Sequence, residues 1–362
     1  MINTDECIIR KYREGDEKEI NDLFNEVFDD RRSLEEWRWK FKENPLQDTN
    51  FITVAEFRGK IVGQYANLPA LFKYQDKVFK VVFPVDNFVH KDFRGGMKGI
   101  QGKMHEDQCE VVRNKNICLG LGFPNRDAYV IGKRVLKYKD IGQIPVLFKR
   151  LNLRLAAKRR LSWFPGFVLR LIQASSSIGY RLSLGMKNRN PIKGLKIKVI
   201  DSFDERFDIL WAKVKKQHEI IGVRDRRYLN WRYKKPGKNY EIIVAEKDNE
   251  ILGHIVTSTK NTEGASEGYI VDMLSTGDER VDSTLINKAL FVLASKNVDF
   301  VLCWMLPDNK IYDRLKENGF VRRDVFTPVN AVYCIFDPSA VDESFIKDIR
   351  NWYLTMADSD VF

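Results

Sequence analysis

The stretch VDNFVHKDFRGGMKGIQGKM, from Val85 to Met104, decides the fold of this chain. A strand pattern that ends at His90 leads into a glycine-rich loop, and a helix pattern follows the loop at once. The first amides of a helix have no partner inside the helix and carry a partial positive charge. Because glycine has no Cβ, an oxygen can approach such amides closely. The stretch therefore predicts a loop that binds a pyrophosphate or a similar anion.

Strands and helices alternate on both sides of this stretch. Before it, hydrophobic periodicity predicts a strand at 7–11, helices at 14–28 and 34–41, and strands at 51–57, 61–72 and 77–90. After it, we expect a strand at 117–123, a helix from 126 and a strand at 141–148. Pro84 cannot donate a hydrogen bond to a sheet ladder, so it predicts a bulge or a sheet edge.

The same order of elements restarts near Leu195. The pattern predicts strands at 196–201, 241–246, 251–259, 269–274, 300–305 and 329–336, and helices from 203, at 283–296 and at 309–318. Both halves contain a similar hairpin, AEFRGKIVGQ at 55–64 and AEKDNEILGH at 245–254. A duplicated fold explains this economically. We expect a first domain at 1–150, a linker at 151–194, a second domain at 195–337 and a C-terminal tail at 338–362.

Length and composition indicate a folded protein of two domains. The chain has 362 residues, which exceeds the usual size of one core, and 44% of them are apolar. The five cysteines include no C-x-x-C pair and have no histidine at metal-binding spacing, so we expect neither a disulfide framework nor a metal site. The charged N-terminus, and the lack of any run of 18 apolar residues, indicate a cytoplasmic protein.

The net charge of +11 comes from one segment. Residues 141–200 contain 13 Lys or Arg and no Asp or Glu, which leaves 48 basic and 50 acidic residues elsewhere. We therefore do not expect a nucleic acid partner. Residues 151–190 interleave basic side chains with Leu, Trp and Phe, a pattern typical of a helix on an anionic membrane surface. A linker helix packed across two domains would need the same apolar face, so both interpretations stay open.

Four stretches resemble GNAT acyltransferases. They are the stretch quoted above, GFPNRDAYVIGKRVLKYKDIG (122–142), RDRRYLNWRY (224–233) and LKENGF (315–320). The whole chain resembles the tandem-GNAT proteins associated with surface-polysaccharide functions in bacteria and archaea. The resemblance implies an α/β fold with mixed sheets in two GNAT-like domains, the second degenerate. It also implies an N-acyltransferase that uses acetyl-coenzyme A and an amine of a small molecule, such as an amino sugar.

The resemblance assigns the anion of the glycine-rich loop to coenzyme A. It places pantetheine along the backbone of Asn87, Phe88 and Val89, in a gap where two parallel strands separate. Further residues that it assigns to coenzyme A are Arg94, Gly95, Gly96, Lys98, Gly99, Ile100, Gln101, Gly102 and Asn125. Compared with the family pattern, the loop holds two extra residues, Gly96 and Met97.

Direct attack of an amine on a thioester requires alignment, a donor to the carbonyl oxygen and a base for the ammonium. Asp86 is the carboxylate nearest the expected gap and is our first candidate for the base or for binding the amine. Glu56, on the second strand, is the next candidate. Either residue could instead be solvated on its strand.

The departing thiolate also needs an acid in many GNAT enzymes, which place a tyrosine on the helix after the fifth strand. Asn125 matches the asparagine that precedes this tyrosine. The usual tyrosine position falls on Gly132 or Lys133, neither of which can serve. Either the thiolate leaves unprotonated through solvent, or Tyr129 is the acid. Tyr138, which matches a structural aromatic residue of the family, is the other substitute.

The second half lacks the features of a coenzyme site. At the position of the loop it has Ser275–Arg280, whose two carboxylates would repel a pyrophosphate. The motif RDRRYLNWRY mixes cations with aromatic rings, which suits an anionic or ring-bearing ligand. The candidate substrate-binding residues are Arg224, Arg227, Trp231, Arg232 and Tyr233. Alternatively, the aromatic residues belong to the core and the arginines are solvated.

Two other functions stay open at this stage. The altered loop and the missing tyrosine also fit a lapsed tandem-GNAT protein that binds coenzyme A or a partner without turnover. An aminoacyl-tRNA-dependent transferase of the cell-wall type could use the basic segment, but a coenzyme A loop argues against it. Release of coenzyme A in the presence of amines separates the first alternative from an active enzyme.

Overall fold

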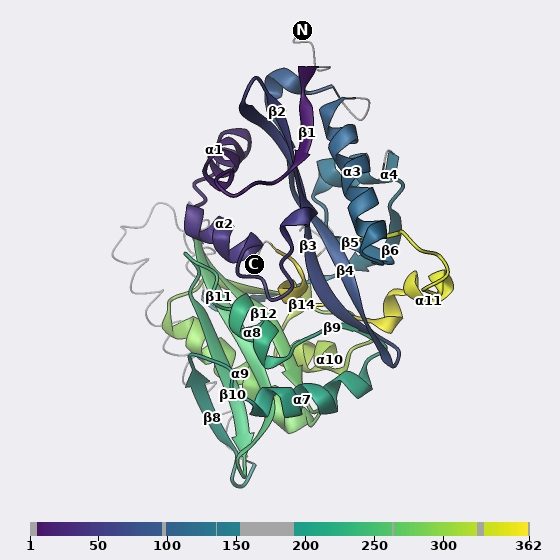
Figure 1. Cartoon of the computed structure of the whole chain (residues 1–362). Helices are drawn as coiled ribbons and strands as arrows, with labels where there is room; N and C mark the ends of the chain where they lie inside the picture. The colour runs from purple at the N-terminus through teal and green to yellow at the C-terminus, as the bar shows by residue number, and fades with distance from the viewer. Residues whose placement is uncertain are drawn as a thin grey trace, which may run out of the picture. The chain divides into compact units, whose positions relative to one another are not determined.

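The computed structural model describes residues 6–95, 99–134, 136–152, 192–262, 264–323 and 329–360. Contacts divide the chain into two units, and neither unit is continuous in sequence. Unit 1 combines Met1–Gly142, Arg227–Gly237 and Asn330–Asn351, and unit 2 combines Gln143–Arg226, Lys238–Val329 and Trp352–Phe362. Each unit has a mixed β-sheet with helices against it, which confirms the expected fold class (Figure 1).

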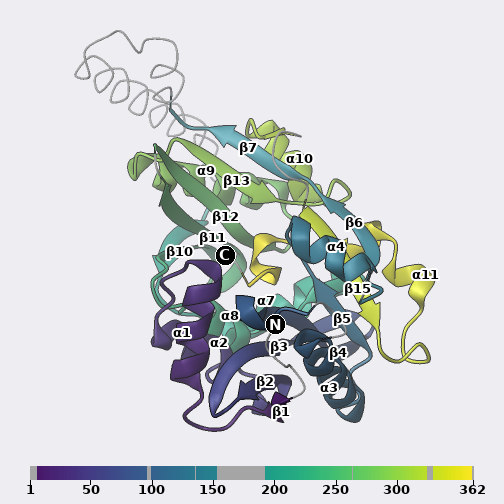
Figure 2. The same cartoon turned by 90° about the horizontal axis from the view of Figure 1, so that it is seen from above.

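Unit 1 contains a sheet in the order β1-β2-β3-β4-β5-β15-β6. Its strands are β1 (Ile8–Lys11), β2 (Ile52–Phe57), β3 (Lys60–Tyr74), β4 (Lys77–Val89), β5 (Leu119–Gly122), β6 (Lys139–Ile144) and β15 (Val329–Ile335). Its helices are α1 (Glu17–Phe28), α2 (Leu34–Phe41), η2 (Thr49–Phe51), η3 (Lys91–Phe93), α3 (Ile100–Asn114), α4 (Arg126–Arg134), α8 (Arg226–Arg232), α11 (Glu343–Ile346) and η6 (Ile349–Asn351). Helices α1 and α2 lie on one side of the sheet, and α3 and α4 lie on the other (Figures 1 and 2).

Apolar spacing and caps explain the helices that cover this sheet. In α1, Ile20 and Leu23 are three residues apart and buried. In α3, Ile100 and Met104 are four residues apart and belong to one buried cluster. Ser33 begins α2, because its side chain accepts a hydrogen bond from a backbone amide of the first turn. The spacing of three and four residues decides which face of each helix meets the sheet.

Unit 2 contains a sheet in the order β14-β7-β13-β12-β11-β10-β8. Its strands are β7 (Val146–Arg150), β8 (Lys196–Ile200), β10 (Tyr240–Lys247), β11 (Glu250–Thr262), β12 (Ala265–Ser275), β13 (Phe300–Trp304) and β14 (Val321–Arg322). Two short strands, β9 (Ile220–Gly222) and β16 (Trp352–Tyr353), pair in parallel with each other. The helices are α7 (Arg206–Val214), η5 (Lys215–Gln217), α9 (Glu279–Ser295), α10 (Lys310–Glu317) and η7 (Met356–Asp358).

In each of the two strand orders given above, one strand comes from the other half of the sequence. β15, late in the chain, pairs with β5 in unit 1, where Val332 lies opposite Gly122. β7, which directly follows β6, pairs with β13 and β14 in unit 2. The single strand expected at 141–148 is therefore two strands in different sheets. Periodicity predicts that a strand forms but not which strand it pairs with, so the expected limit at 150 differs from the structure.

The C-terminal residues also differ from the expected tail. Residues 338–351 belong to unit 1, and residues 352–360 return to unit 2 as β16 and η7. Thr355 begins η7 with a reciprocal pair of hydrogen bonds to Asp358 and its neighbours. Trp352 and Tyr353 are buried. The end of the described chain is thus part of a core rather than an appendage.

Two helices of unit 1 support the duplication that the hairpins indicate. α2 carries Trp39 and α8 carries Trp231, and the two rings stack 5.0 Å apart at an angle of 12°. Each indole N–H donates a hydrogen bond of 2.8 Å to the backbone carbonyl oxygen of the other tryptophan. A cation and then an aromatic residue follow both, Lys40 with Phe41 and Arg232 with Tyr233. Equivalent residues of the two halves therefore meet in one reciprocal contact.

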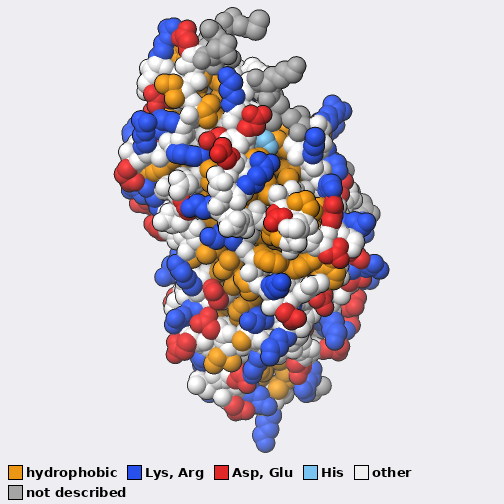
Figure 3. All heavy atoms as spheres, turned by 45° about the vertical axis from the view of Figure 1, so that its right-hand side comes forward, with side chains coloured by type: hydrophobic (Ala, Val, Ile, Leu, Met, Phe, Trp, Pro, Cys, Tyr) orange, Lys and Arg blue, Asp and Glu red, His pale blue; other side chains and the backbone are white. Residues whose placement is uncertain are grey.

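The surface mixes both signs of charge. On the face drawn in Figure 3, Lys and Arg side chains are interspersed with Asp and Glu. In the part of the chain that the structure describes, no helix is long and apolar enough to cross a membrane. Apart from Leu151 and Asn152, the basic segment at 151–190 lies outside the described residues, so its contact with a membrane stays a prediction.

Candidate functional site

A gap opens in the sheet of unit 1 between β4 and β5. The recorded pairs between these parallel strands are Val81 with Leu119 and Val82 with Gly120. β4 continues to Val89, and within the described residues this second part pairs with β3 alone. Backbone groups of an unpaired strand edge can bind an extended ligand as an additional strand.

A β-bulge shapes the open part of β4. The register between β3 and β4 shifts between Gln64 and Ala66, so Tyr65 lies opposite two residues, Asp86 and Asn87. Asp86 has a left-handed φ of 50°. The Gln64 side chain donates to the carbonyl oxygen of Asp86 at 3.0 Å, and the Asn87 side chain accepts from the amide of Ala66 at 2.9 Å. Two side chains therefore fix the bulge.

The bulge does not lie at Pro84, where the sequence placed it. Pro84 stays in register opposite Asn67. It follows Val82, the last residue of β4 with a recorded partner on β5. A residue without an amide proton suits a strand that is leaving its neighbour, which agrees with the alternative of a sheet edge.

Asp86 is buried between two cations. Its carboxylate forms ion pairs with Arg32 and, at 2.8 Å, with Lys40, and all three side chains are less than 10% exposed. Burial by itself would raise the pKa of Asp86, but Lys40 and Arg32 outweigh it and hold the pKa below its ordinary value. One interpretation of the sequence placed Asp86 in solvent, but the structure buries its side chain. A carboxylate with two partners and a low pKa is a weak proton acceptor.

Unit 2 repeats this ion pair at the equivalent place. Arg224 precedes Trp231 by seven residues, as Arg32 precedes Trp39, and Asp272 occupies a Val-Asp pair like that of Asp86. The buried Arg224 Nε lies 3.1 Å from Asp272, and the register of β11 and β12 shifts beside Asp272. An Asp–Arg pair of this kind thus occurs in both units. It occurs in a unit that lacks the glycine-rich loop, so it does not require a bound coenzyme.

Glycines 95 and 99 bring two ends of the glycine-rich loop into contact. A Cβ on Gly99 would lie 3.0 Å from the Cα of Gly95, so a larger residue would push the backbone apart. Gly99 is the N-cap of α3 and gives it no side-chain cap. Among the described residues, the first amides of α3 thus have no side-chain acceptor from the cap, which leaves them for an anion. Gly96, Met97 and Lys98 lie outside the described residues.

Of the other residues expected around the anion, some have side chains that are buried or bonded elsewhere. The Arg94 side chain turns back and donates to the carbonyl oxygen of Val89 at 3.2 Å. Ile100 and Gly102 are buried in α3, and Gln101 is half-buried. Ile100 can therefore contribute its backbone amide but not its side chain.

The corresponding helix of unit 2 begins differently. Asp278 is the N-cap of α9, and its carboxylate accepts hydrogen bonds from the amides of Arg280 and Val281. These amides are satisfied by the chain itself, and the carboxylate adds a negative charge. This geometry agrees with the expectation that Ser275–Arg280 repels a pyrophosphate.

Tyr129, the expected acid, lies at the surface of α4. Its hydroxyl donates to Asp140 at 2.9 Å in an exposed setting, and this bond raises its pKa. The Asn125 side chain accepts from the amide of Ala128 at 2.9 Å and so caps α4. Both residues have local partners, and no recorded contact brings either one to the bulge of β4.

A cluster that the sequence did not single out lies under α3 and α4. Tyr65 is 2% exposed, and its hydroxyl lies 2.9 Å from His105 Nδ1. Tyr138 lies close enough to contribute to the raised pKa of Tyr65, and Cys109 Sγ lies 3.4 Å from His105 Nε2. Burial raises the pKa of both tyrosines and lowers that of His105. In the sequence, each of these residues is typical of a protein core. Their contacts, and hence the cluster, appear only in the tertiary structure.

Glu56 and His90 have local partners as well. The Glu56 carboxylate accepts from Arg10 Nε at 2.7 Å, and Arg10 also pairs with Asp16. His90 Nε2 lies 3.1 Å from Glu26 of α1. Glu56 therefore belongs to an ion-pair cluster between β1 and β2 rather than to the bulge.

The five residues predicted to bind substrate do not form one site. Arg224 lies in unit 2 with Asp272, whereas the others lie in unit 1. Arg227 donates to the carbonyl oxygen of Pro45, and Trp231 stacks on Trp39. Arg232 is buried, and its guanidinium lies 5.8 Å from the ring of Tyr233. These contacts support the alternative in which the aromatic residues are structural, but the arginines are mostly buried or bonded rather than solvated.

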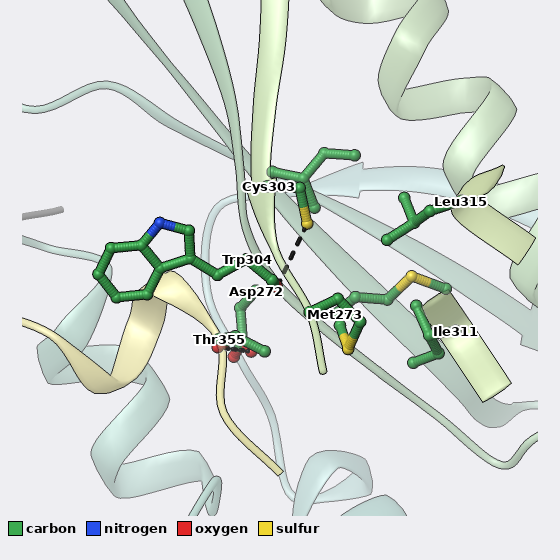
Figure 4. A pocket seen from close by; sticks show the side chains of 9 residues that line it. Asp272, Met273, Cys303, Trp304, Ile311, Leu315 and Thr355 are labelled. Atoms are coloured by element: carbon green, nitrogen blue, oxygen red, sulfur yellow. Dashed lines mark hydrogen bonds between the residues drawn. The ribbon is translucent and has the colours of Figure 1, made fainter. Parts of the chain in front are cut away.

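A small hollow in unit 2 lies where β12 and β13 separate. Figure 4 shows Asp272 and Thr355 on one side of it and Cys303 on another. Thr355 Oγ1 donates to Asp272 at 2.9 Å, and the Tyr353 hydroxyl donates to the carbonyl oxygen of Met273. The C-terminal segment thus meets β12 beyond the last recorded pair with β13, Ile270 with Cys303. Within the described ranges, no group of three or more His, Cys, Asp or Glu could hold a metal ion.

Residues 8–132 match the family model of the acetyltransferase (GNAT) domain. No curated protein matches the chain in sequence. A solved GCN5-related N-acetyltransferase from Anabaena variabilis has a TM-score of 0.62 at 10% identity and covers 91% of this chain and 73% of its own. N-myristoyltransferase of Saccharomyces cerevisiae, solved with bound myristoyl-CoA, has a TM-score of 0.62 at 14% identity, with coverages of 98% and 89%.

These likenesses define the class of fold. The fold is that of the GNAT acyltransferases, and it extends over nearly all of this chain. The family model itself covers only the part that contains the gap between β4 and β5 and the start of α3.

Proposed function

We propose that this chain is an acyl-coenzyme A-dependent N-acyltransferase whose cosubstrate binds in unit 1. The observation that carries the proposal is the coincidence of two features. β4 leaves β5 after Val82, and α3 begins beside that opening with an uncapped N-terminus behind two touching glycines. The first feature suits an extended pantetheine arm, and the second suits a pyrophosphate.

The residues present fit coenzyme A. The backbone of Asn87–Val89 would bind the pantetheine arm, and the amides at Gly95, Gly99 and the first turn of α3 would bind the phosphates. The bulge held by Gln64 and Asn87 fixes that backbone before the ligand arrives. A preformed site of this kind loses little entropy on binding.

In the reaction, the amine nitrogen of the acceptor bonds to the thioester carbonyl carbon, and the carbon–sulfur bond breaks. The ammonium proton passes to solvent or to a base, and the thiolate takes up a proton. Asp86 serves in this proposal as a positioning residue, because Arg32 and Lys40 already occupy its carboxylate. The acyl group that we propose is acetyl, and the acceptor is a small-molecule amine such as an amino sugar of surface polysaccharide.

Calorimetry on the full chain tests the cosubstrate. We expect one acetyl-coenzyme A per chain, because α3 is open to an anion and α9 is capped by Asp278. Gly99→Val should weaken binding at least tenfold, since its side chain would collide with the backbone of Gly95. Gly122→Ala is the matched control, because its Cβ would make only ordinary contacts of 3.5 Å or more. Two molecules per chain, or none, would contradict the proposal.

Turnover is then measured as release of free thiol from acetyl-, octanoyl- and myristoyl-coenzyme A with a panel of amino sugars and other amines. Release that depends on the amine supports the enzyme. Binding without release from any combination supports the second candidate, a lapsed GNAT protein. That candidate is favoured by one observation, the surface position of Tyr129.

The proposed membrane contact of residues 151–190 rests on sequence alone. Co-sedimentation of the full chain with anionic vesicles should exceed that with neutral vesicles at low salt and should fall at high salt. Equal recovery with both kinds of vesicle would assign the segment to packing.

A further inference from the structure

The opening between β4 and β5 is closed at one end. Val82 with Gly120 is the last recorded pair between the two strands, and we call this pair the fork. The glycine-rich loop follows the far end of β4, at Val89, so a pantetheine arm would run from that end toward the fork. Its thioester would come nearest the fork, where two paired strands leave no place for a third between them. A longer acyl chain would therefore have to leave the sheet on one of its two faces.

Two stacked rings cover the fork on the face away from α3. Val82 belongs to the same buried cluster as Val112 of α3, so its side chain points toward that helix. Because side chains alternate along a strand, the next residue, Phe83, points to the opposite face. The ring of Phe83 stacks on that of Phe123, which directly follows β5, with centroids 6.0 Å apart and planes at 20°. The stack thus connects the two strands just beyond their last pair.

A third ring covers the fork on the α3 face. A Cβ on Gly120 would lie 3.1 Å from the ring of Phe336, so this ring rests directly on the backbone of β5. Phe336 packs against the cluster that contains Val82, and its amide donates to the carbonyl oxygen of Cys118 at 2.8 Å. Among the described residues, aromatic rings therefore stand over both faces of the sheet at the fork.

The two rings of the stack differ in exposure. Phe83 is 8% exposed, and Phe72 of β3 packs against it with centroids 6.0 Å apart. Phe123 is half-buried and follows the end of β5. Phe83 is therefore held in the core, whereas Phe123 keeps accessible surface and can be shortened with less damage to the sheet.

We propose that the stack of Phe83 and Phe123 restricts the cosubstrate to a short acyl group such as acetyl, and that Phe336 closes the other face. The inference rests on the proposed function and names the acyl class that the site accepts. The pantetheine arm is common to all acyl-coenzyme A molecules, so only side chains near the thioester can discriminate between them. An acetyl group adds one methyl group to the thioester carbonyl and ends before the fork. A longer chain has to displace a ring from a close-packed core, which opens a void elsewhere.

The test is the acyl-length profile of the full-length protein. Calorimetry gives the Kd of acetyl- and octanoyl-coenzyme A, and thiol release with the amine selected above gives kcat/KM. For the wild-type chain we expect octanoyl-coenzyme A to bind about tenfold more weakly than acetyl-coenzyme A. Its kcat/KM should be about 10²-fold lower, within the range by which an apolar pocket discriminates chain length. The ratio of the two Kd values tests the proposal even if the chain transfers no acyl group.

Phe123→Ala removes the accessible ring of the stack. It should raise the octanoyl-to-acetyl ratio of kcat/KM about tenfold, while the Kd of acetyl-coenzyme A changes less than about threefold. Phe345→Ala is the matched control, because Phe345 is also a half-buried phenylalanine of unit 1 but packs on Tyr74 instead. Its ratio should equal that of the wild type. If Phe123→Ala does not fold, Phe123→Leu, which keeps more of the packing, carries the same expectation with a smaller gain.

Three results would overturn the proposal. They are equal binding and turnover of both cosubstrates by the wild-type chain, an unchanged ratio in a folded Phe123→Ala chain, and the same gain in the Phe345→Ala chain. Binding of neither cosubstrate by the wild-type chain would contradict the proposed function itself, so the two failures differ.

Discussion

At the scale of single residues, the Asp–Arg pairs show what the sequence could and could not predict. Asp86 lies on the part of β4 that has no pairs with β5, and its place on this strand follows from the pattern that precedes the loop. Its partners were not predictable, since Arg32 lies in a loop and Lys40 on a helix. Tyr65 and His105 were overlooked as a pair, because their contact depends on packing between α3 and the sheet.

The first prediction concerns stability. Asp86→Asn leaves two buried cations without their shared anion, which should lower the free energy of unfolding by about 3–5 kcal/mol. Asp272→Asn, its counterpart in unit 2, should cost a similar amount. Urea unfolding of both variants measures this. A variant at Asp86 with wild-type stability and a turnover lowered 10²- to 10⁴-fold would restore this residue as the base.

The direction of the pKa shift of Asp86 determines how the stability of the chain depends on pH. The pKa of Asp86 is lowered in the folded chain, so the pair stabilises the fold fully above the unfolded pKa of about 3.9. This contribution is lost as the pH falls through the folded value. Wild-type and Asp86→Asn chains should therefore differ by a constant amount between pH 6 and 8 and converge only below about pH 4. Denaturant midpoints of both chains at a series of pH values measure this difference in stability. If the difference already became smaller near neutral pH, a group other than Asp86 would cause it.

At the scale of elements, the starts of α3 and α9 separate the two units. The sequence indicated this difference, because glycines stand at one start and carboxylates at the other. Asp278→Ala should remove the cap of α9 and cost about 0.5–2 kcal/mol. Ser33→Ala, which removes the cap of α2, is the matched control and should cost about as much. Thermal unfolding measures both.

The Asp278→Ala variant also tests how many coenzyme A molecules the chain binds. The Asp278→Ala chain should still bind one acetyl-coenzyme A, because Glu279 remains in the first turn and no pair of touching glycines precedes α9 in the described residues. A second binding event in calorimetry would show that the aspartate alone closes that site.

At the scale of the whole molecule, most strands and helices were predictable and the pairing between halves was not. β4 was expected at 77–90 and spans Lys77–Val89, because an alternating pattern between turns is local information. The strands expected at 141–148 and 329–336 were each assigned to their own half, whereas β7 and β15 pair in the sheet of the other half. An apolar run does not determine which sheet its strand joins, so the exchange of strands between the two halves could be seen only in the tertiary structure.

The C-terminal segment gives a further prediction. Thr355→Val removes the hydroxyl that bonds both Asp272 and Arg224, and it should destabilise unit 2 by about 1–3 kcal/mol. Hydrogen exchange should speed up first in β12 and β16, which this segment joins. Thr262→Val, at an exposed site, is the control and should change little. Unchanged exchange in β12 would mean that the segment adds nothing to that core.

The exchange of strands also bears on synthesis. A ribosome releases the chain in order, so the place between β5 and β6 stays vacant until Val329–Ile335 has been made. Roughly 200 residues separate β5 from β15, a wait of about 10–40 s at ordinary rates of translation. During that time the edge of β5 is open to other chains. Nascent protein cut short before residue 335 should therefore aggregate or be retained by chaperones, even though the cosubstrate loop is already complete.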